Sequence, residues 1–333
     1  MKKSLLALAV LGGFVAGASA QSSVTLFGIV DVSAKAVKND GVGTLKTLAN
    51  SGLNSSRLGF RGVEDLGGGL KAGFWLEGAL SNDDGTPAGF DFRRRSTVSL
   101  MGGFGEVRLG RDYTPTFWST TIFDPFGTNG VGSSLNMTHY VGQTNYVRAS
   151  NSISYLTPAM GGLYGQLTVA AGENVTGKYV GGRIGYAAGP FNVAAAAGQT
   201  DGVGAGADFK VWNVAGSYDF GMAKVMAQYN NEKLASPTNA KENRWLIGAV
   251  VPMGQGELHA SFIRTDETSA ANRDANQVAL GYVYNLSKRT ALYGTVARLD
   301  NKNNGTLAIG GGNAGITPGG NSTGMEVGLR HSF

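Results

Sequence analysis

The chain has 333 residues, no cysteine, 15% charged residues and 53 glycines, where an average usage of about 7% predicts about 23 glycines. The lack of cysteine excludes a disulfide framework, a thiolate zinc site and a cysteine nucleophile. No apolar run reaches the roughly 18 residues that a membrane-spanning helix requires. The three histidines, His139, His259 and His331, lie too far apart in sequence to suggest a metal motif. We therefore expect neither a metal ion nor a cofactor.

The first twenty residues have the three parts of a secretory signal peptide. Lys2 and Lys3 form a basic start, residues 5–15 are apolar, and residues 18–20 read Ala-Ser-Ala, a small-residue cleavage site. An N-terminal membrane anchor is the alternative, but it needs a longer apolar run. We predict a signal peptide at 1–20 and one mature domain at 21–333. Its 26 basic residues against 23 acidic ones give a net charge of about +3, too small a surplus to indicate nucleic-acid binding.

Apolar residues recur at every second position along the mature chain, which is the period of a strand with one apolar face. Such stretches lie at residues 24–35, 70–77, 212–218, 225–229, 245–251, 278–286 and 325–333. The segment 163–197 is rich in alanine and glycine and gives no clear register. Counting along the chain, we expect sixteen strands and a nearly all-β protein.

The predicted connections alternate between short turns and long polar segments. The short turns lie at 65–69, 102–105, 189–190, 220–222 and 286–288, and the long segments at 39–55, 81–91, 112–144, 200–208, 234–242, 266–275 and 301–323. Transmembrane β-barrels have short periplasmic turns, longer extracellular loops and strands of about ten residues. The sequence therefore predicts an all-β, 16-stranded antiparallel transmembrane β-barrel.

A soluble β-sandwich is the alternative fold, because strands with one polar face fit it as well. Sixteen strands in a single domain are many for a sandwich. Aromatic residues also fall near the predicted strand ends, as expected for the interfacial girdles of a membrane barrel. These residues are Tyr155, Tyr186, Tyr218, Trp245 and Tyr293. Both features favour the barrel.

Several motifs along the mature chain resemble the general porins of β-proteobacteria, of the neisserial and comamonad type. They are SVTLFG at 23–28, SRLGFRG at 56–62, EDLG at 64–67, GEVRLGR at 105–111, DPFG at 124–127, LSKRT at 286–290 and GLRHSF at 328–333. The resemblance implies a homotrimer in the Gram-negative outer membrane, surrounded by lipid and lipopolysaccharide. It also implies a third loop folded into each lumen and passive diffusion of ions and small hydrophilic solutes. In this family an aromatic C-terminal residue, here Phe333, is read by the outer-membrane assembly machinery.

The segment 112–144 is the candidate for a loop that narrows the pore. It is long, has few charges, and carries apolar residues such as Phe117, Trp118 and Phe123, which a solvated surface loop would not favour. Its acidic residues are Asp112 and Asp124. A surface loop that packs on a neighbouring subunit is the alternative. We expect an infolded loop that brings little negative charge to the pore.

Strand parity assigns a set of arginines to the lumenal face, since an arginine facing lipid near the midplane would cost about 2–4 kcal/mol. With Asp112 and Asp124 from the loop, the predicted pore constriction consists of Arg57, Arg93, Arg95, Arg148, Asp112 and Asp124. Arg94 has the opposite parity, which places it at the membrane interface. For each arginine the alternative is a lumenal salt bridge to Glu77, Asp65 or Glu106. Positive charge around a narrow, low-dielectric passage selects anions.

Two other functions are alternatives to a general anion-preferring porin. An outer-membrane hydrolase needs a nucleophile or activated water beside a histidine base, and no histidine has such a grouping near it in sequence. We therefore predict that the protein is not an enzyme. A substrate-specific channel for phosphate, organic anions or peptides stays open, because a ladder of basic and aromatic residues would also guide a single solute.

Overall fold

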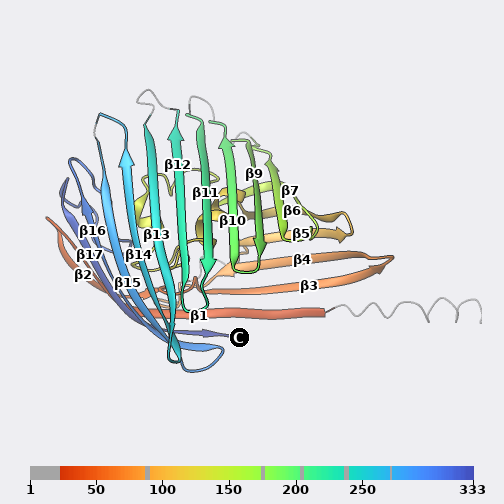
Figure 1. The fold of residues 1–333 in the computed structure, drawn as a ribbon, viewed down its shortest axis with the longest axis horizontal. Helices are drawn as coiled ribbons and strands as arrows, with labels where there is room; N and C mark the ends of the chain where they lie inside the picture. Colours follow the sequence, from red (N-terminus) through yellow and green to blue (C-terminus); the bar gives the residue numbers. More distant parts are fainter. Residues whose placement is uncertain (1–22, 87–90, 174–176, 203–205, 236–239, 271) are drawn as a thin grey trace, which may run out of the picture.

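The computed structural model describes residues 23–86, 91–173, 177–202, 206–235, 240–270 and 272–333. The predicted signal peptide at 1–20 lies outside the described residues. Long antiparallel strands dominate the chain and pair side by side to form one curved wall (Figure 1). No helix in the described part of the chain is long and apolar enough to cross a membrane.

The strands and helices follow each other in the order expected for an up-and-down barrel. The strands are β1 (Ser23–Asn39), β2 (Gly43–Asn50), β3 (Arg57–Gly67), β4 (Leu70–Ala79), β5 (Arg95–Gly102), β6 (Gly105–Tyr113), β7 (Arg148–Leu156), β8 (Leu163–Ala170), β9 (Tyr179–Ala188), β10 (Phe191–Thr200), β11 (Phe209–Asp219), β12 (Lys224–Leu234), β13 (Lys241–Met253), β14 (Gly256–Glu267), β15 (Ala275–Asn285), β16 (Thr290–Asn301) and β17 (Asn321–Ser332). Between β6 and β7 lie the α-helix α2 (Pro115–Ile122) and the 3-10 helix η1 (Ser134–Met137).

The seventeen β segments occupy sixteen positions around a closed ring. The first half of β1 pairs with β3 and its second half with β2, so β2 and β3 together fill one position. On its other side β1 pairs with β17, which closes the ring. The prediction of a 16-stranded antiparallel β-barrel is thus confirmed.

The second position of the ring differs from the sequence prediction. The segment 39–55 was expected to be a long loop, but after a short turn the chain returns beside β1 as β2. The six residues between β2 and β3 then leave the wall. The Asp31 carboxylate accepts hydrogen bonds from the backbone N–H groups of Gly52, Leu53 and Asn54, at 3.3, 2.9 and 2.6 Å. A buried carboxylate with three such donors holds residues 51–56 on the inner face of the barrel.

The strands form because apolar residues face outward and polar residues face the lumen. On β15, Val278 and Leu280 are about half exposed on the outer face, whereas Gln277 and Ala279 are buried on the inner face. This is the reverse of a soluble protein, and it suits a wall that meets lipid outside and polar groups inside. The expected girdle position of Tyr293 is wrong. Its side chain is buried in the barrel and its hydroxyl donates to Asp31, because its position on β16 has inward parity.

Candidate pore and the loop that lines it

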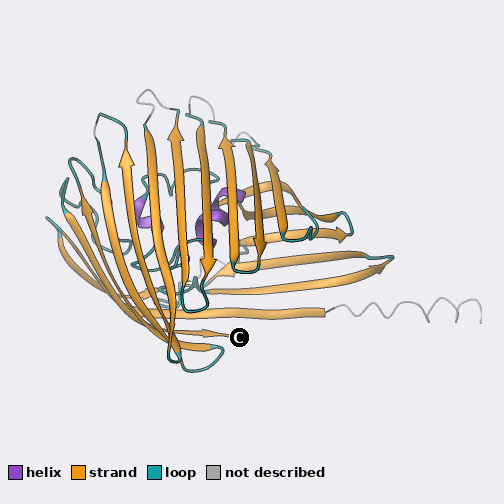
Figure 2. Cartoon of the chain, in the orientation of Figure 1, coloured by secondary structure: helices purple, strands orange, loops and turns teal. Residues whose placement is uncertain are grey.

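The segment between β6 and β7, residues 114–147, lies against the inner wall of the barrel (Figure 2). It begins two residues later than expected, because Asp112 is paired with Ala149 as part of β6. Helix α2 starts at Pro115, and the preceding Thr114 hydroxyl accepts from the backbone N–H of Phe117 at 3.3 Å. A threonine cap followed by proline at the first helical position is a favoured start of a helix.

Amide side chains of the wall satisfy the backbone of α2. Asn213 on β11 donates to the Thr116 carbonyl at 3.0 Å, and Gln228 on β12 donates to the carbonyls of Thr120 and Phe123, both at 3.3 Å. The carbonyls of Thr120 and Phe123 belong to the C-terminal turn of the helix, where no helical N–H group is available, and they need other partners when they are buried. These strands therefore hold the helix flat against the lumenal face.

Inward-facing glycines make room for the rest of the loop. A Cβ atom on Gly248 of β13 would lie 2.5 Å from the Pro125 Cγ, and one on Gly281 of β15 would lie 3.1 Å from the Phe126 ring. A Cβ on Gly324 of β17 would lie 3.0 Å from the Val131 side chain. The loop thus packs directly on strand backbone, which is one reason why the chain needs so many glycines.

Asp124 organises the turn of the loop and does not face the pore. Its carboxylate accepts from the backbone N–H groups of Phe126, Thr128 and Ser134 at 2.9, 3.1 and 3.0 Å. The residue is only 4% exposed, and burial raises the pKa of the carboxyl above its ordinary value. A structural role in the loop accounts for these contacts.

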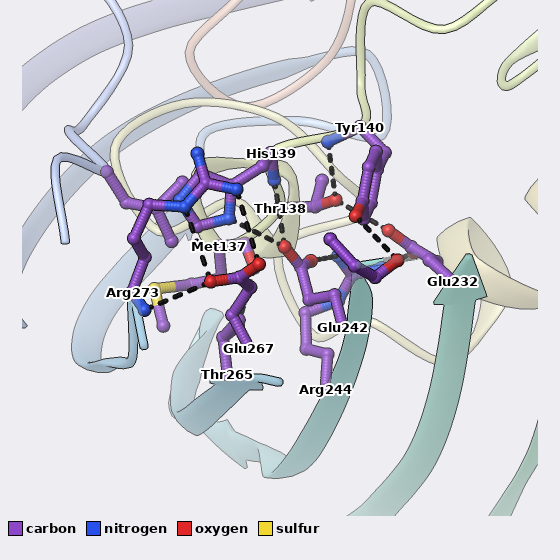
Figure 3. A network of polar contacts seen from close by, with 12 residues as sticks. Met137, Thr138, His139, Tyr140, Glu232, Glu242, Arg244, Thr265, Glu267 and Arg273 are labelled. Carbon is purple, nitrogen blue, oxygen red and sulfur yellow. Dashed lines mark hydrogen bonds and ion pairs between the residues drawn. The ribbon is translucent and has the colours of Figure 1, made fainter. Parts of the chain in front are cut away.

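A buried charged network ties the later part of the loop to the wall (Figure 3). Glu232 on β12 accepts from the Thr138 hydroxyl at 2.6 Å and from the Tyr146 hydroxyl at 2.9 Å. Arg244 on β13 lies 2.9 Å from the Glu232 carboxylate and donates to the same tyrosine at 3.1 Å. His139 adds a contact of 2.7 Å between its Nδ1 and Glu242. The loop is therefore held by a buried ion pair and by hydrogen bonds to two carboxylates of the wall.

Burial makes the two tyrosines of the loop, Tyr140 and Tyr146, weaker acids than a tyrosine in water. Burial, reinforced by the Glu242 charge, raises the pKa of Tyr140 to about 12. Burial also raises the pKa of Tyr146. Both hydroxyls are therefore protonated at neutral pH and can act as hydrogen-bond donors in the network.

Three arginines lie close together on the wall beside the loop, and we call them the arginine cluster: Arg57, Arg94 and Arg148. Arg57 and Arg94 both approach the Glu77 Oε1 atom, at 3.4 and 2.7 Å. Arg148 donates through Nε to the Arg94 carbonyl at 2.7 Å, and its guanidinium lies 4.3 Å from the centre of the Tyr113 ring. Tyr113 itself packs on Phe117 of the loop, with ring centres 4.9 Å apart. The cluster and the loop are thus in contact.

The predicted constriction residues are only partly brought together. Arg57 and Arg148 belong to the arginine cluster, whereas Arg95 lies lower on the wall, 3.4 Å from the Asp112 carboxylate. Arg93 is about half exposed and pairs with Asp91 at 2.7 Å, away from the cluster. Asp112 also binds Arg108 at 2.7 Å. Asp124 is buried in the loop, as described above.

The expectation that Arg94 lies at the membrane interface is wrong. Its side chain is 11% exposed and ion-paired with Glu77 in the lumen. Strand parity fails here because β5 begins only at Arg95, so the preceding residues do not alternate. Arg108 is a lumenal residue outside the predicted constriction, and its alternation with Val107 and Leu109 on β6 is the signal that could have found it.

Positive charge exceeds negative charge on this part of the wall. Contacts on this part of the wall involve six arginines of β3 to β7 and the adjoining residues, and three carboxylates: Arg57, Arg61, Arg94, Arg95, Arg108 and Arg148, with Glu77, Glu106 and Asp112. Six cations against three anions leave a local charge of about +3. Such an excess at a narrow passage attracts small anions.

Comparison with known proteins agrees with this architecture. Outer membrane porin protein 32 of Delftia acidovorans is 45% identical over the full length of both chains, and major outer membrane protein P.IB of Neisseria lactamica is 31% identical over the full length of both. The solved structure of an anion-selective porin from Comamonas acidovorans has a TM-score of 0.88 and 42% identity, covering 94% of this chain and 100% of that one. The model of the Gram-negative porin family matches residues 7–304. The chain belongs to the Gram-negative porin family.

Proposed function

We propose that the protein is a general diffusion porin of the outer membrane, with a water-filled channel that prefers anions. The observation that supports the preference is the arginine cluster beside the infolded loop, where Arg57 and Arg94 share the Glu77 carboxylate and Arg148 donates to the Arg94 carbonyl. The relation to a porin described as anion-selective supports the same direction. Export by the signal peptide at 1–20 belongs to this proposal.

We further propose that the barrels assemble as homotrimers among outer-membrane lipid and lipopolysaccharide. The outward faces of the strands are apolar, as membrane or a neighbouring barrel requires. Purified protein inserted into planar bilayers is expected to conduct in groups of three equal steps. A folded, monomeric sample that gives only single steps would contradict the trimer.

The test of anion preference is the zero-current potential across a planar bilayer in a chloride gradient. We expect the triple variant Arg57→Ser, Arg94→Ser, Arg148→Ser to lose preference for chloride. In water, one unit charge about 7 Å from a passing ion contributes about 0.6 kcal/mol, which screening at 0.1 M roughly halves. Because each charge acts with opposite sign on chloride and on potassium, three charges change the chloride-to-potassium permeability ratio by about twentyfold at 0.1 M and much less at 1 M.

A matched control removes three cations that lie outside the arginine cluster. Lys38, Arg264 and Arg298 are exposed, and their replacement by serine is expected to leave the permeability ratio almost unchanged. Equal losses in both triple variants would mean that overall charge, and not the cluster, sets the preference. Saturation of the current by phosphate or dicarboxylates would favour the substrate-specific channel instead.

A further inference from the structure

We propose that a lumenal cavity below the arginine cluster binds small organic carboxylates that carry a hydrocarbon or aromatic body. This inference rests on the proposed anion-preferring channel and adds a separate binding site to it. The cavity has a volume of about 420 Å³ and lies on the inner face of β3 to β6. Its central residues are Arg61, Trp75 and Arg95.

The cavity lies nearer the short turns than the arginine cluster does. Arg61 follows Arg57 on β3 by four residues, which is about 13 Å along a strand, and β3 ends at the short turn to β4. Arg61 pairs with Trp75, and Trp75 pairs with Thr97, so one row of side chains crosses three strands. Since short turns are periplasmic in such barrels, the cavity opens toward the periplasmic side.

Two guanidinium groups rest on aromatic rings in this cavity. Arg61 lies 5.2 Å from the centre of the Trp75 ring and 5.4 Å from that of Phe27, and Arg95 lies 4.4 Å from the Trp75 ring. In the described part of the chain no carboxylate lies within ion-pair distance of Arg61. Stacking holds a planar guanidinium in place while its N–H edge stays available to an incoming carboxylate.

The remaining charges around the cavity almost cancel. Arg108 pairs with Glu106 at 2.9 Å, and Asp112 lies between Arg95 and Arg108 at 3.4 and 2.7 Å. Together with Arg61 the cavity has three cations and two anions, an excess of about one positive charge. That excess matches a ligand with one carboxylate.

The lining of the cavity selects an organic ligand over an inorganic anion. Beside the hydroxyls of Thr97 and Ser99 it includes Val63 and Met101 together with the Trp75 ring. Val63 is 44% exposed although it faces the lumen of a channel for polar solutes. Apolar surface contributes about 25 cal/mol per Å² when a ligand covers it. Chloride or phosphate gains nothing from this contact, whereas benzoate can place its ring there.

The test measures block of the chloride current by benzoate added from the periplasmic side of a planar bilayer. We expect concentration-dependent block of the native channel, and about tenfold or weaker affinity in Arg61→Gln, because a charge-assisted bidentate contact is lost. Arg61→Lys keeps the charge but not the planar fork, and is expected to restore only part of the affinity. Met101→Ser is expected to weaken block by benzoate and to leave any block by inorganic phosphate unchanged.

The matched control is Arg183→Gln. Arg183 on β9 also rests on an aromatic ring in the barrel, 5.1 Å from the centre of Tyr164, but lies away from the cavity. It should change benzoate affinity by less than about twofold. Folding of each variant is checked by heat-modifiable mobility on gels.

The outcomes separate this inference from the proposed function. If Arg61→Gln keeps native benzoate affinity, or if phosphate and benzoate block equally in every variant, the cavity is not the proposed site. In either case a chloride preference that depends on the arginine cluster would leave the general function intact. A channel without that preference would overturn the proposed function itself, whatever the benzoate result.

Discussion

Glu77 is the carboxylate that pairs with the arginine cluster, and its charge limits the positive charge of the channel. Arg57 and Arg94 approach the same Glu77 oxygen, and the Trp75 indole N–H donates to the other at 3.1 Å. A carboxylate held by so many donors stays in place while ions pass. It also brings two like charges together that would otherwise repel each other.

We expect Glu77→Gln to increase anion preference at low salt. Removing one negative charge from the cluster should raise the chloride-to-potassium permeability ratio by about threefold at 0.1 M, and by far less at 1 M because the Debye length shrinks to about 3 Å. Zero-current potentials at both salt concentrations check this. An unchanged ratio at 0.1 M would mean that permeating ions do not pass close to Glu77.

Phe333, the aromatic residue at the end of β17, is expected to be needed for assembly of the barrel. It exchanges two backbone hydrogen bonds of 3.1 Å with Gly28, and a Cβ on Gly28 would collide with its ring. The ring is 43% exposed on the outer face. Deleting Phe333 should lower the yield of folded barrel in the outer membrane several-fold without affecting export, as measured by heat-modifiable protein in membrane fractions. Normal yields would show that assembly does not depend on it.

The elements show where sequence patterns succeed and where they fail. Outward apolar residues follow the period of a strand, so the sixteen strands and most short turns could be predicted. The return of the chain as β2 could not, because its sequence from Gly43 to Asn50 is polar and resembles a loop. Arg94 was misplaced because parity applies only inside a continuous strand.

The contacts of the infolded loop could not be predicted from the sequence either. Glu232 and Arg244 lie on strands that are more than 80 residues away from Thr138 and Tyr146 along the chain. Nothing local distinguishes such residues from other lumenal side chains. Only the register of the neighbouring strands brings them together behind the loop.

The packing of the loop on the inward-facing Gly248 can be tested by adding a methyl group there. In Gly248→Ala the new methyl group would lie 2.5 Å from the Pro125 Cγ and 2.6 Å from the Ala260 carbonyl oxygen. Overpacking of this kind typically costs about 1–3 kcal/mol. We expect the loop to shift from the wall, with altered conductance and more current fluctuation in single-channel records.

Gly294→Ala provides the control, because its nearest neighbours would lie at 3.7 Å, an ordinary contact distance. It should leave conductance and current noise as in the native channel. If both alanine variants behave alike, the close contact between Gly248 and Pro125 does not position the loop.

At the scale of the whole molecule, the barrel is closed by its first and last strands. Eleven residue pairs join β1 to β17 across nearly the whole length of the chain. Contacts between residues so far apart in sequence form slowly, because the intervening chain must be ordered first. The ring therefore cannot close until β17 has been made, which is consistent with our prediction that Phe333, at the end of that strand, acts as an assembly signal.

Because the two ends of the described chain lie close together, they can be joined by a linker and new termini can be opened at another turn, which gives a circular permutant of the barrel. Phe333 lies opposite Gly28, five residues from Ser23, so a linker of about six residues spans the roughly 17 Å between them. New termini between Gly68 and Gly69 would fall in a short turn where both residues have positive φ, 61° and 82°. We expect this permutant to refold in detergent with the native heat-modifiable mobility. In cells it should reach the outer membrane poorly, because Phe333 keeps its partner but no longer ends the chain.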